Sequence, residues 1–170
     1  MKLIPLLALL LSITSTNAQI RYAPLTTENF AISVQNLTKT AVNKLEFDVY
    51  LLDTDASQSF ELGACQLGFL FNSLIYTGGT ISVAISNTGS GLNAAQQFTA
   101  TPNVTNSLPG YPNQTLIMLA GRTVPGAGNG TIISTTAAGT LLTHFILTSS
   151  VNFTANFTPN LTFISNGVTS

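Results

Sequence analysis

The side chains best suited to chemistry lie on one short segment, where polar residues alternate with apolar ones. Glu46, Asp48 and Tyr50 occupy every second position of the segment 45–51. A period of two is typical of a β-strand, so we expect the three side chains on one face, about 7 Å from one to the next. Carboxylates can accept hydrogen bonds from sugar hydroxyls while a ring covers the apolar face of a sugar. This stripe is a candidate ligand-binding site; a solvated outer face of a sheet is the simpler interpretation.

Catalysis by these carboxylates is not indicated. Glycosidases need two carboxyl groups about 5–9.5 Å apart on either side of the scissile bond, whereas Glu46 and Asp48 point the same way from one strand. The chain has a single histidine, His144, and no Gly-x-Ser-x-Gly turn that would present a nucleophile to it. We interpret His144 as a surface or partly buried strand residue and predict that the protein is not an enzyme.

A second acidic segment follows directly. Residues 53–57 (DTDAS) resemble the first half of a calcium-binding loop, with oxygen-bearing side chains at its positions 1, 3 and 5. Gln58 stands where such a loop has glycine, and Ala64 where it has glutamate, so the full motif is absent. Two hypotheses remain: a looser calcium site that uses Asp53 and Asp55, or a turn in which these side chains cap the backbone. No other cofactor is expected.

Aromatic residues close to predicted turns form a third group of candidates. Tyr76, Phe98 and Tyr111 fall near such turns and are expected to be at or near the surface. Exposed loop aromatics often anchor ligands or partners. They also commonly cover the end of a sandwich core, and the sequence leaves both hypotheses open. We count Tyr76 and Tyr111 with the candidate ligand-binding residues.

The composition limits the possible partners. The chain has 170 residues, of which 45% are hydrophobic and only 6% charged, with a formal net charge of -1. Five lysine and arginine residues are too few for the basic face that neutralises nucleic-acid phosphates, so we exclude a nucleic-acid partner. One cysteine, Cys65, allows neither an internal disulfide nor a cysteine-based zinc site.

The first residues have the pattern of a secretory signal peptide. Lys2 precedes an apolar run over 3–13, and small residues at Thr16 and Ala18 favour cleavage after position 18. Eleven apolar residues fall short of the roughly 20 that span a bilayer. We therefore predict a signal peptide at 1–18, a lead-in at 19–28, one domain at 29–165 and a tail at 166–170. The mature protein would be secreted or on the cell surface and would not span the membrane.

The segments that position the candidate residues are predicted to be strands. Turn-forming glycine, proline and asparagine separate short apolar or alternating segments, and no amphipathic helical stripe follows the signal. We predict an all-β, antiparallel two-sheet sandwich of about seven to nine strands. The alternating segments are 30–35, 45–51, 81–86, 144–148 and 161–163, and those apolar on both faces, expected to be covered on both sides, are 67–71 and 116–120.

Several of these segments carry a resemblance to a known family. The chain resembles the cohesin-like modules of secreted Bacteroidota proteins, which group with the family 2 and family 3 carbohydrate-binding sandwiches. The resemblance covers about residues 30–164 and implies an immunoglobulin-like or jelly-roll sandwich with a binding or adhesive role. The motifs that carry it are 45–52 (LEFDVYLL), 60–62 (FEL), 67–69 (LGF), 78–83 (GGTISV) and Gly139-Thr140 ahead of 145–147 (FIL).

Two features depart from that family. Its bacterial proteins usually continue into further domains and a C-terminal sorting module, whereas this sequence stops at Ser170; many of its carbohydrate-binding members display a row of tryptophans, and this chain has none. We expect a secreted, non-catalytic module that binds a polysaccharide or mediates adhesion. The alternative is a structural or protein-binding module, cohesin-like in use as well as in shape, with an extracellular protein as its partner.

Overall fold

The computed structural model describes residues 29–106, 108–123, 126–155 and 158–164. Within these ranges the chain forms strands and one short 3-10 helix, and the all-β prediction is confirmed. The strands are β1 (Phe30–Ala41), β2 (Lys44–Asp53), β3 (Glu61–Leu62), β4 (Gln66–Asn72), β5 (Ile81–Ser86), β6 (Asn103–Asn106), β7 (Gln114–Ala120), β8 (Thr131–Ile132), β9 (Thr140–Ser149) and β10 (Thr162–Phe163), and the helix is η1 (Ser73–Tyr76).

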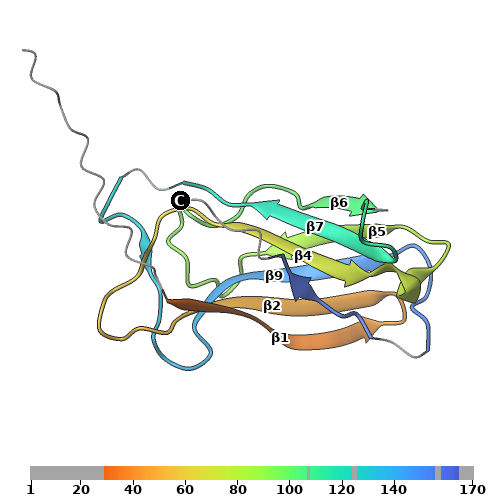
Figure 1. The fold of residues 1–170 in the computed structure, drawn as a ribbon, viewed down its shortest axis with the longest axis horizontal. Helices are drawn as coiled ribbons and strands as arrows, with labels where there is room; N and C mark the ends of the chain where they lie inside the picture. The colour runs from red at the N-terminus through yellow and green to blue at the C-terminus, as the bar shows by residue number, and fades with distance from the viewer. Residues whose placement is uncertain (1–28, 107, 124–125, 156–157, 165–170) are drawn as a thin grey trace, which may run out of the picture.

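The strands form two facing layers (Figure 1). The first sheet has the order β1-β2-β9-β5 and the second the order β10-β4-β7-β6, while β3 and β8 form a separate pair. All described strand pairs are antiparallel. The predicted two-sheet sandwich is therefore confirmed. Strands β3 and β6 were not predicted, because each is too short to show a periodic pattern.

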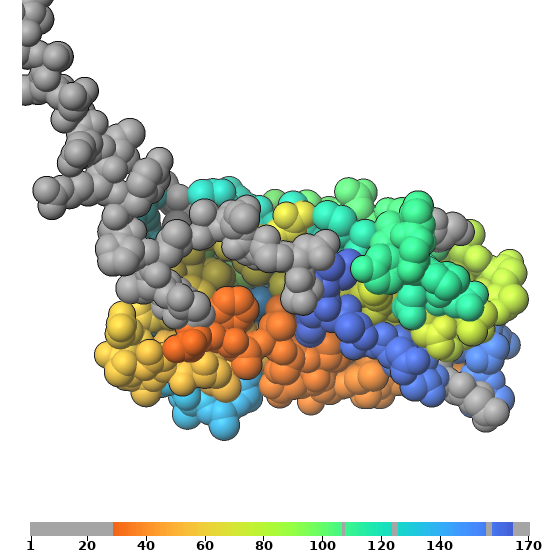
Figure 2. Space-filling view, viewed as in Figure 1, coloured from red at the N-terminus to blue at the C-terminus, as the bar shows by residue number. Residues whose placement is uncertain are grey.

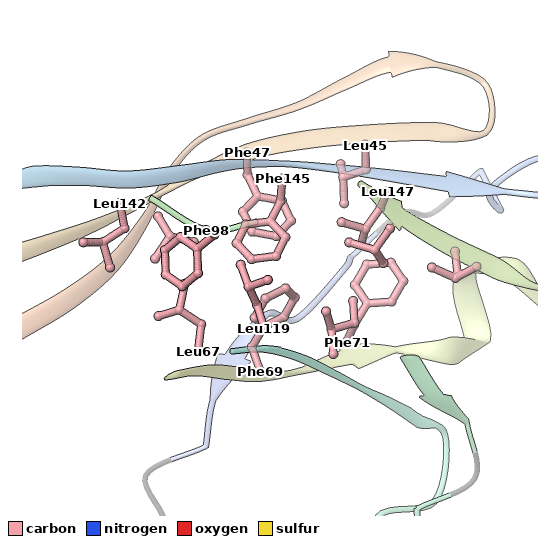
Figure 3. Close-up of a cluster of buried hydrophobic side chains, with 14 of the residues drawn as sticks. Leu45, Phe47, Leu67, Phe69, Phe71, Phe98, Leu119, Leu142, Phe145 and Leu147 are labelled. Atoms are coloured by element: carbon pink, nitrogen blue, oxygen red, sulfur yellow. The ribbon is translucent and has the colours of Figure 1, made fainter. Parts of the chain in front are cut away.

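The core lies between the two sheets and combines packed phenylalanine rings with leucines (Figure 3). On β2, Leu45, Phe47 and Val49 are fully buried while the residues between them are only partly so, as alternation predicts. Phe47 and Phe145 stack with ring centres 5.2 Å apart, and Phe69 from the second sheet packs edge-on against both. Burial of these faces holds the two sheets together.

The sequence predicted that β4 and β7 are covered on both faces, and this prediction is wrong for β7. On β7, Met118 is 38% exposed and Ala120 is exposed, so the outer face of this strand is open. On β4, by contrast, Leu70 is buried, and it pairs with Thr162 of β10. An apolar run in the sequence thus did not decide whether both faces of the strand are buried.

The predicted segments 1–18, 19–28 and 166–170 lie outside the described residues.

A tight turn before β9 brings two strands into close contact. Gly139 has φ 79°, and a Cβ atom at this position would lie 2.4 Å from the Leu51 carbonyl oxygen. No side chain fits such an approach without moving the backbone. The Gly139-Thr140 step in the sequence is thus explained by packing against β2.

The residue before this glycine predicts a stabilising substitution. Ala138 also adopts a positive φ, 81°, on an exposed turn, a conformation that costs a residue with a Cβ about 1–2 kcal/mol. We expect Ala138→Gly to stabilise the protein by about 0.5 kcal/mol, since the greater freedom of glycine in the unfolded chain offsets part of the relief. Gly139→Ala should do the opposite. Urea unfolding of both variants tests this, and a destabilised Ala138→Gly would contradict it.

Candidate functional site

The predicted polar stripe lies on the outer face of the first sheet and meets the histidine there. In the β2–β9 register Asp48 pairs with His144. His144 Nδ1 lies 2.7 Å from Asp48 Oδ1, and His144 Nε2 lies 3.2 Å from Glu46 Oε2. A neutral imidazole donates a hydrogen bond at one nitrogen, and a protonated ring at both. The histidine therefore connects the two carboxylates across neighbouring strands.

Three further side chains hold the same two carboxylates. Asn36 Nδ2 donates to Asp48 Oδ2 at 2.6 Å, and Thr40 Oγ1 donates to Glu46 Oε1 at 2.8 Å. Lys44 Nζ lies 3.3 Å from Glu46 Oε1. We call Asn36, Thr40, Lys44, Glu46, Asp48 and His144 the outer-face cluster; it spans β1, β2 and β9.

The cluster keeps Glu46 ionised. The hydrogen bond from Thr40 is the main cause that lowers the pKa of Glu46; desolvation opposes it, and Lys44 and His144 lower the pKa further. A lowered pKa means that the native protein favours the charged carboxylate. This contribution to stability is present above the ordinary glutamate pKa and is lost as pH falls through the lowered value. Glu46 is thus charged at neutral pH.

The cluster is accessible, and Tyr50 extends it along β2. The side chains of His144, Glu46 and Asp48 are 27%, 24% and 15% exposed, and Tyr50 is half-buried on the same face. Two hollows of the described surface, of about 410 and 330 Å³, are lined by other residues. The outer-face cluster therefore offers fixed hydrogen-bonding groups on an open sheet face.

The chemistry of this face is that of binding. Both carboxylates lie on β2 and both contact the same imidazole, so they do not oppose each other across a cleft as in glycosidases. Within the described residues, no group of three or more histidine, cysteine, aspartate or glutamate side chains is placed to hold a metal ion. What the arrangement can do is accept and donate hydrogen bonds toward a ligand laid across the sheet.

The loop aromatics are not brought to this face. Tyr76 was expected near the surface but is only 5% exposed, because η1 turns its ring inward against Phe71, with the ring centres 6.0 Å apart. Its hydroxyl contacts Asn106 and Thr115. Phe98, also expected near the surface, is 1% exposed and belongs to the core. Of the two hypotheses left open for these aromatics, Tyr76 and Phe98 follow the second, because both rings belong to the core.

Tyr111 is exposed, but it lies away from the cluster. Its side chain is 46% exposed in the loop before β7, a strand of the second sheet. The cluster occupies the outer face of the first sheet. Tyr111 and Tyr50 are thus on different layers of the sandwich and do not form one surface.

The two aspartates after β2 cap the turn, as one of the two hypotheses predicted. Asp53 Oδ1 accepts from the Asp55 amide at 2.9 Å, and Asp55 Oδ1 accepts from the Ser57 amide at 3.0 Å and from the Ser57 hydroxyl at 2.5 Å. These hydrogen bonds lower the pKa of Asp55. Asp53 is buried and Asp55 is only partly so.

Some important polar residues were missed in the sequence. Gln96 is buried, and its amide joins the Leu62 carbonyl to Thr131. Nothing in its turn-like surroundings predicted burial.

The contact of His144 with both carboxylates was also missed. Alternation had placed all three side chains on outward positions, but the sequence did not show that β2 and β9 pair.

Comparisons with known proteins are sparse. The sequence matches no protein-family profile and no curated protein. A solved structure of endoglucanase CelQ from Clostridium thermocellum, complexed with cellotetraose, aligns with a TM-score of 0.48 and 10% identity over 87% of this chain and 25% of that one. The chain thus spans about a quarter of the length of that protein, and a likeness of this degree assigns neither activity nor ligand. In the described part of this chain no helix is long and apolar enough to cross a lipid bilayer.

Proposed function

We propose that this protein is a non-catalytic carbohydrate-binding module whose ligand lies across the outer face of the first sheet. One observation carries the proposal: Glu46, Asp48 and His144 form a hydrogen-bonded group on the same exposed face as Tyr50. Their positions are set by strands and mutual contacts, so little side-chain freedom is lost when a ligand binds.

The chemistry of the face suits a sugar chain. Sugars present hydroxyls that donate to carboxylates and accept from imidazole or lysine, and C–H faces that pack on aromatic rings. The cluster supplies the first kind of contact and Tyr50 the second. An open sheet face would also receive an extended polysaccharide rather than a small enclosed ligand. The absence of tryptophan from the chain suggests modest affinity.

The predicted signal peptide supports the cellular setting of this proposal. Export after cleavage at position 18 would place the domain outside the cell or at its surface, where polysaccharides and adhesive partners are found. The resemblance to cohesin-like modules of secreted Bacteroidota proteins agrees with this setting. We infer a role in attachment to a polysaccharide.

The binding face can be tested with two tyrosine variants. We expect the purified protein to bind at least one polysaccharide on a glycan array or in affinity electrophoresis, and Tyr50→Ala to weaken that binding about tenfold through loss of ring contact. Asp48→Asn should weaken it as well. Tyr111→Ala removes an equally large ring from the second sheet and should leave the affinity unchanged within about twofold.

Three outcomes of these measurements would contradict the proposal. Equal losses in Tyr50→Ala and Tyr111→Ala would show that the outer face of the first sheet is not the binding surface. Complete absence of binding across polysaccharides, with a folded protein, would refute carbohydrate recognition. Hydrolysis of any bound polysaccharide would refute the non-catalytic role.

A second candidate function, docking of an extracellular protein, is favoured by one specific observation. Among the described strands, β1 pairs only with β2, and its residues, orange in Figure 2, lie along one side of the molecule. Exposed apolar side chains lie along this hairpin: Phe30, Leu37 and Val42 are 54%, 43% and 60% exposed. Open edges accept a strand from a partner chain. Leu37→Lys, which places a charge among these exposed apolar side chains, should weaken such docking while leaving carbohydrate binding intact.

A further inference from the structure

At the end of β2, one of the two oxygens of a buried carboxylate has no hydrogen-bond partner among the described residues. The Asp53 side chain is only 3% exposed, since its position continues the inward phase of the strand. Its Oδ1 accepts from the Asp55 amide, but its Oδ2 is buried and has no hydrogen-bond partner among the described residues. This feature is independent of the outer-face cluster, which lies on the opposite phase of β2.

Such a group is costly unless something pairs with it. Burial of an ionised carboxylate without a compensating partner is strongly unfavourable, and buried charges in proteins are normally paired or bound to a metal ion. Among the described residues Asp53 forms no ion pair with a lysine or arginine, and its Oδ2 has no hydrogen-bond partner. A bound cation would satisfy this buried oxygen.

The surroundings of Asp53 are rich in oxygen. Asp53 lines a hollow of about 410 Å³ between the turn after β2 and the segment after β8. Seven of its ten lining residues carry a side-chain oxygen, and most of these are hydroxyls. The hollow is lined by Asp53, Ala56, Ser57, Gln58, Ser59, Ile132, Ile133, Ser134, Thr135 and Thr136. Asp55, although close in sequence, is not among them.

We propose that Asp53 and the neutral oxygens around it bind a calcium ion that ties the turn after β2 to the segment after β8. Calcium takes six to eight oxygen ligands from carboxylates, carbonyls, hydroxyls and water in a flexible geometry, which suits one carboxylate among hydroxyls. Magnesium demands a tighter octahedron and keeps its waters, and zinc prefers nitrogen and sulfur, which this hollow lacks. Asp55 is not a ligand, because Ser57 engages it instead.

The ligand set predicts a weak site. One carboxylate supplies little charge, so we expect a dissociation constant of about 0.1–1 mM, the range of extracellular calcium modules. At about tenfold excess of calcium over this constant, the melting temperature of the purified protein should rise by about 3–6 °C above its value in EDTA. Magnesium should raise it much less. Isothermal titration with calcium chloride measures the binding directly and requires no variant.

Two matched variants assign the site. Asp53→Asn keeps the shape of the side chain and removes its charge, so it should abolish the calcium-dependent rise; in EDTA it should be at least as stable as the parent protein, since no unpaired charge is buried. Asp55→Asn makes the same change two residues away, and its amide oxygen can still accept from Ser57. It should keep the full calcium response.

Three results would overturn the proposal. The first is an unchanged melting temperature together with no heat of binding for the parent protein at about 10 mM calcium. The second is an unchanged calcium-dependent rise in Asp53→Asn. The third is a calcium-dependent rise that is lost in Asp55→Asn alone. The first would mean that no calcium ion binds at Asp53. Carbohydrate binding through Tyr50 is measured separately, so failure of either proposal leaves the other standing.

Discussion

Phe145→Ala is expected to destabilise the protein by about 3–5 kcal/mol, the usual cost of removing a buried phenylalanine ring. Phe145 is fully buried at the centre of the core. Its ring centre lies 5.2 Å from that of Phe47 and 5.1 Å from that of Phe69 on the second sheet, so one substitution removes contacts on both sides of the interface (Figure 3). The alanine variant would leave a cavity between the sheets.

Urea unfolding measures this loss as a lower midpoint at an unchanged slope, and the melting temperature should fall by on the order of 10 °C. Phe30→Ala is the matched control. Phe30 is 54% exposed and stacks only on Phe60, with ring centres 6.0 Å apart, so its loss should cost less than about 1 kcal/mol. Similar losses in the two variants would mean that the interface between the sheets does not dominate stability.

Gln96→Glu is expected to destabilise the protein by about 2–4 kcal/mol at neutral pH, although it changes one atom. Gln96 is 3% exposed. Its Nε2 donates to the Leu62 carbonyl at 2.6 Å, and its Oε1 accepts from the amide and hydroxyl of Thr131, both at 2.6 Å. A glutamate carboxylate keeps the bonds from Thr131 but directs a charged oxygen at the Leu62 carbonyl.

The loss in this variant should depend on pH in a defined direction. Burial disfavours the charged form, so the introduced glutamate has a higher pKa in the folded than in the unfolded protein. The variant is then least impaired below about pH 4.3, the unfolded value, and loses stability as pH rises through the folded value. Urea unfolding of Gln96→Glu at about pH 4 and about pH 7 measures this difference in stability.

The neighbouring glutamine provides the control. Gln97 is only partly buried, and its Nε2 makes a long, 3.4 Å hydrogen bond to the Leu92 carbonyl. Gln97→Glu should cost less than about 1 kcal/mol and show no comparable pH dependence. If Gln96→Glu destabilised the protein as little as Gln97→Glu, the amide of Gln96 would not be what links its own loop to β3 and β8.

The carboxylate of Glu61, which is only partly buried, links β3 to the segment before β8. Glu61 on β3 accepts from the amides of Gly128 and Gly130 at 3.0 and 2.5 Å, and these backbone hydrogen bonds lower its pKa. A Cβ at Gly130 would lie 2.4 Å from the Leu62 carbonyl oxygen, so glycine is needed for this close approach. The glycine-rich segment 126–130 thus closes around a side chain of this protein.

The cysteine fits the interpretation of an exported protein without disulfides. Cys65 is free and mostly buried, and this burial raises its pKa to about 11. A thiol with a raised pKa forms little thiolate and reacts slowly. Little of the Cys65 thiol is therefore ionised at neutral pH.

The sequence alone determined the fold class and which face of β2, β5 and β9 is buried, although β1, also predicted from alternation, has no buried face and leaves Phe30 54% exposed. Alternation placed Leu45, Phe47 and Val49 inward and left Glu46 and Asp48 outward, and the structure agrees. This succeeds because side chains of a strand alternate strictly between its two faces, so a local pattern is enough. The strand continues to Asp53 in the same buried phase, whereas the sequence pattern predicted a strand that ends at residue 51 and a loop over 53–57.

Only the tertiary structure decided which side chains meet. His144 contacts Asp48 across 96 residues of sequence because β9 pairs with β2 in one register, and a shift by one residue would turn His144 to the core. The burial of Gln96 likewise depends on strands that lie more than 30 residues away in sequence. Strand order and register arise from contacts between distant segments, and no local pattern encodes them.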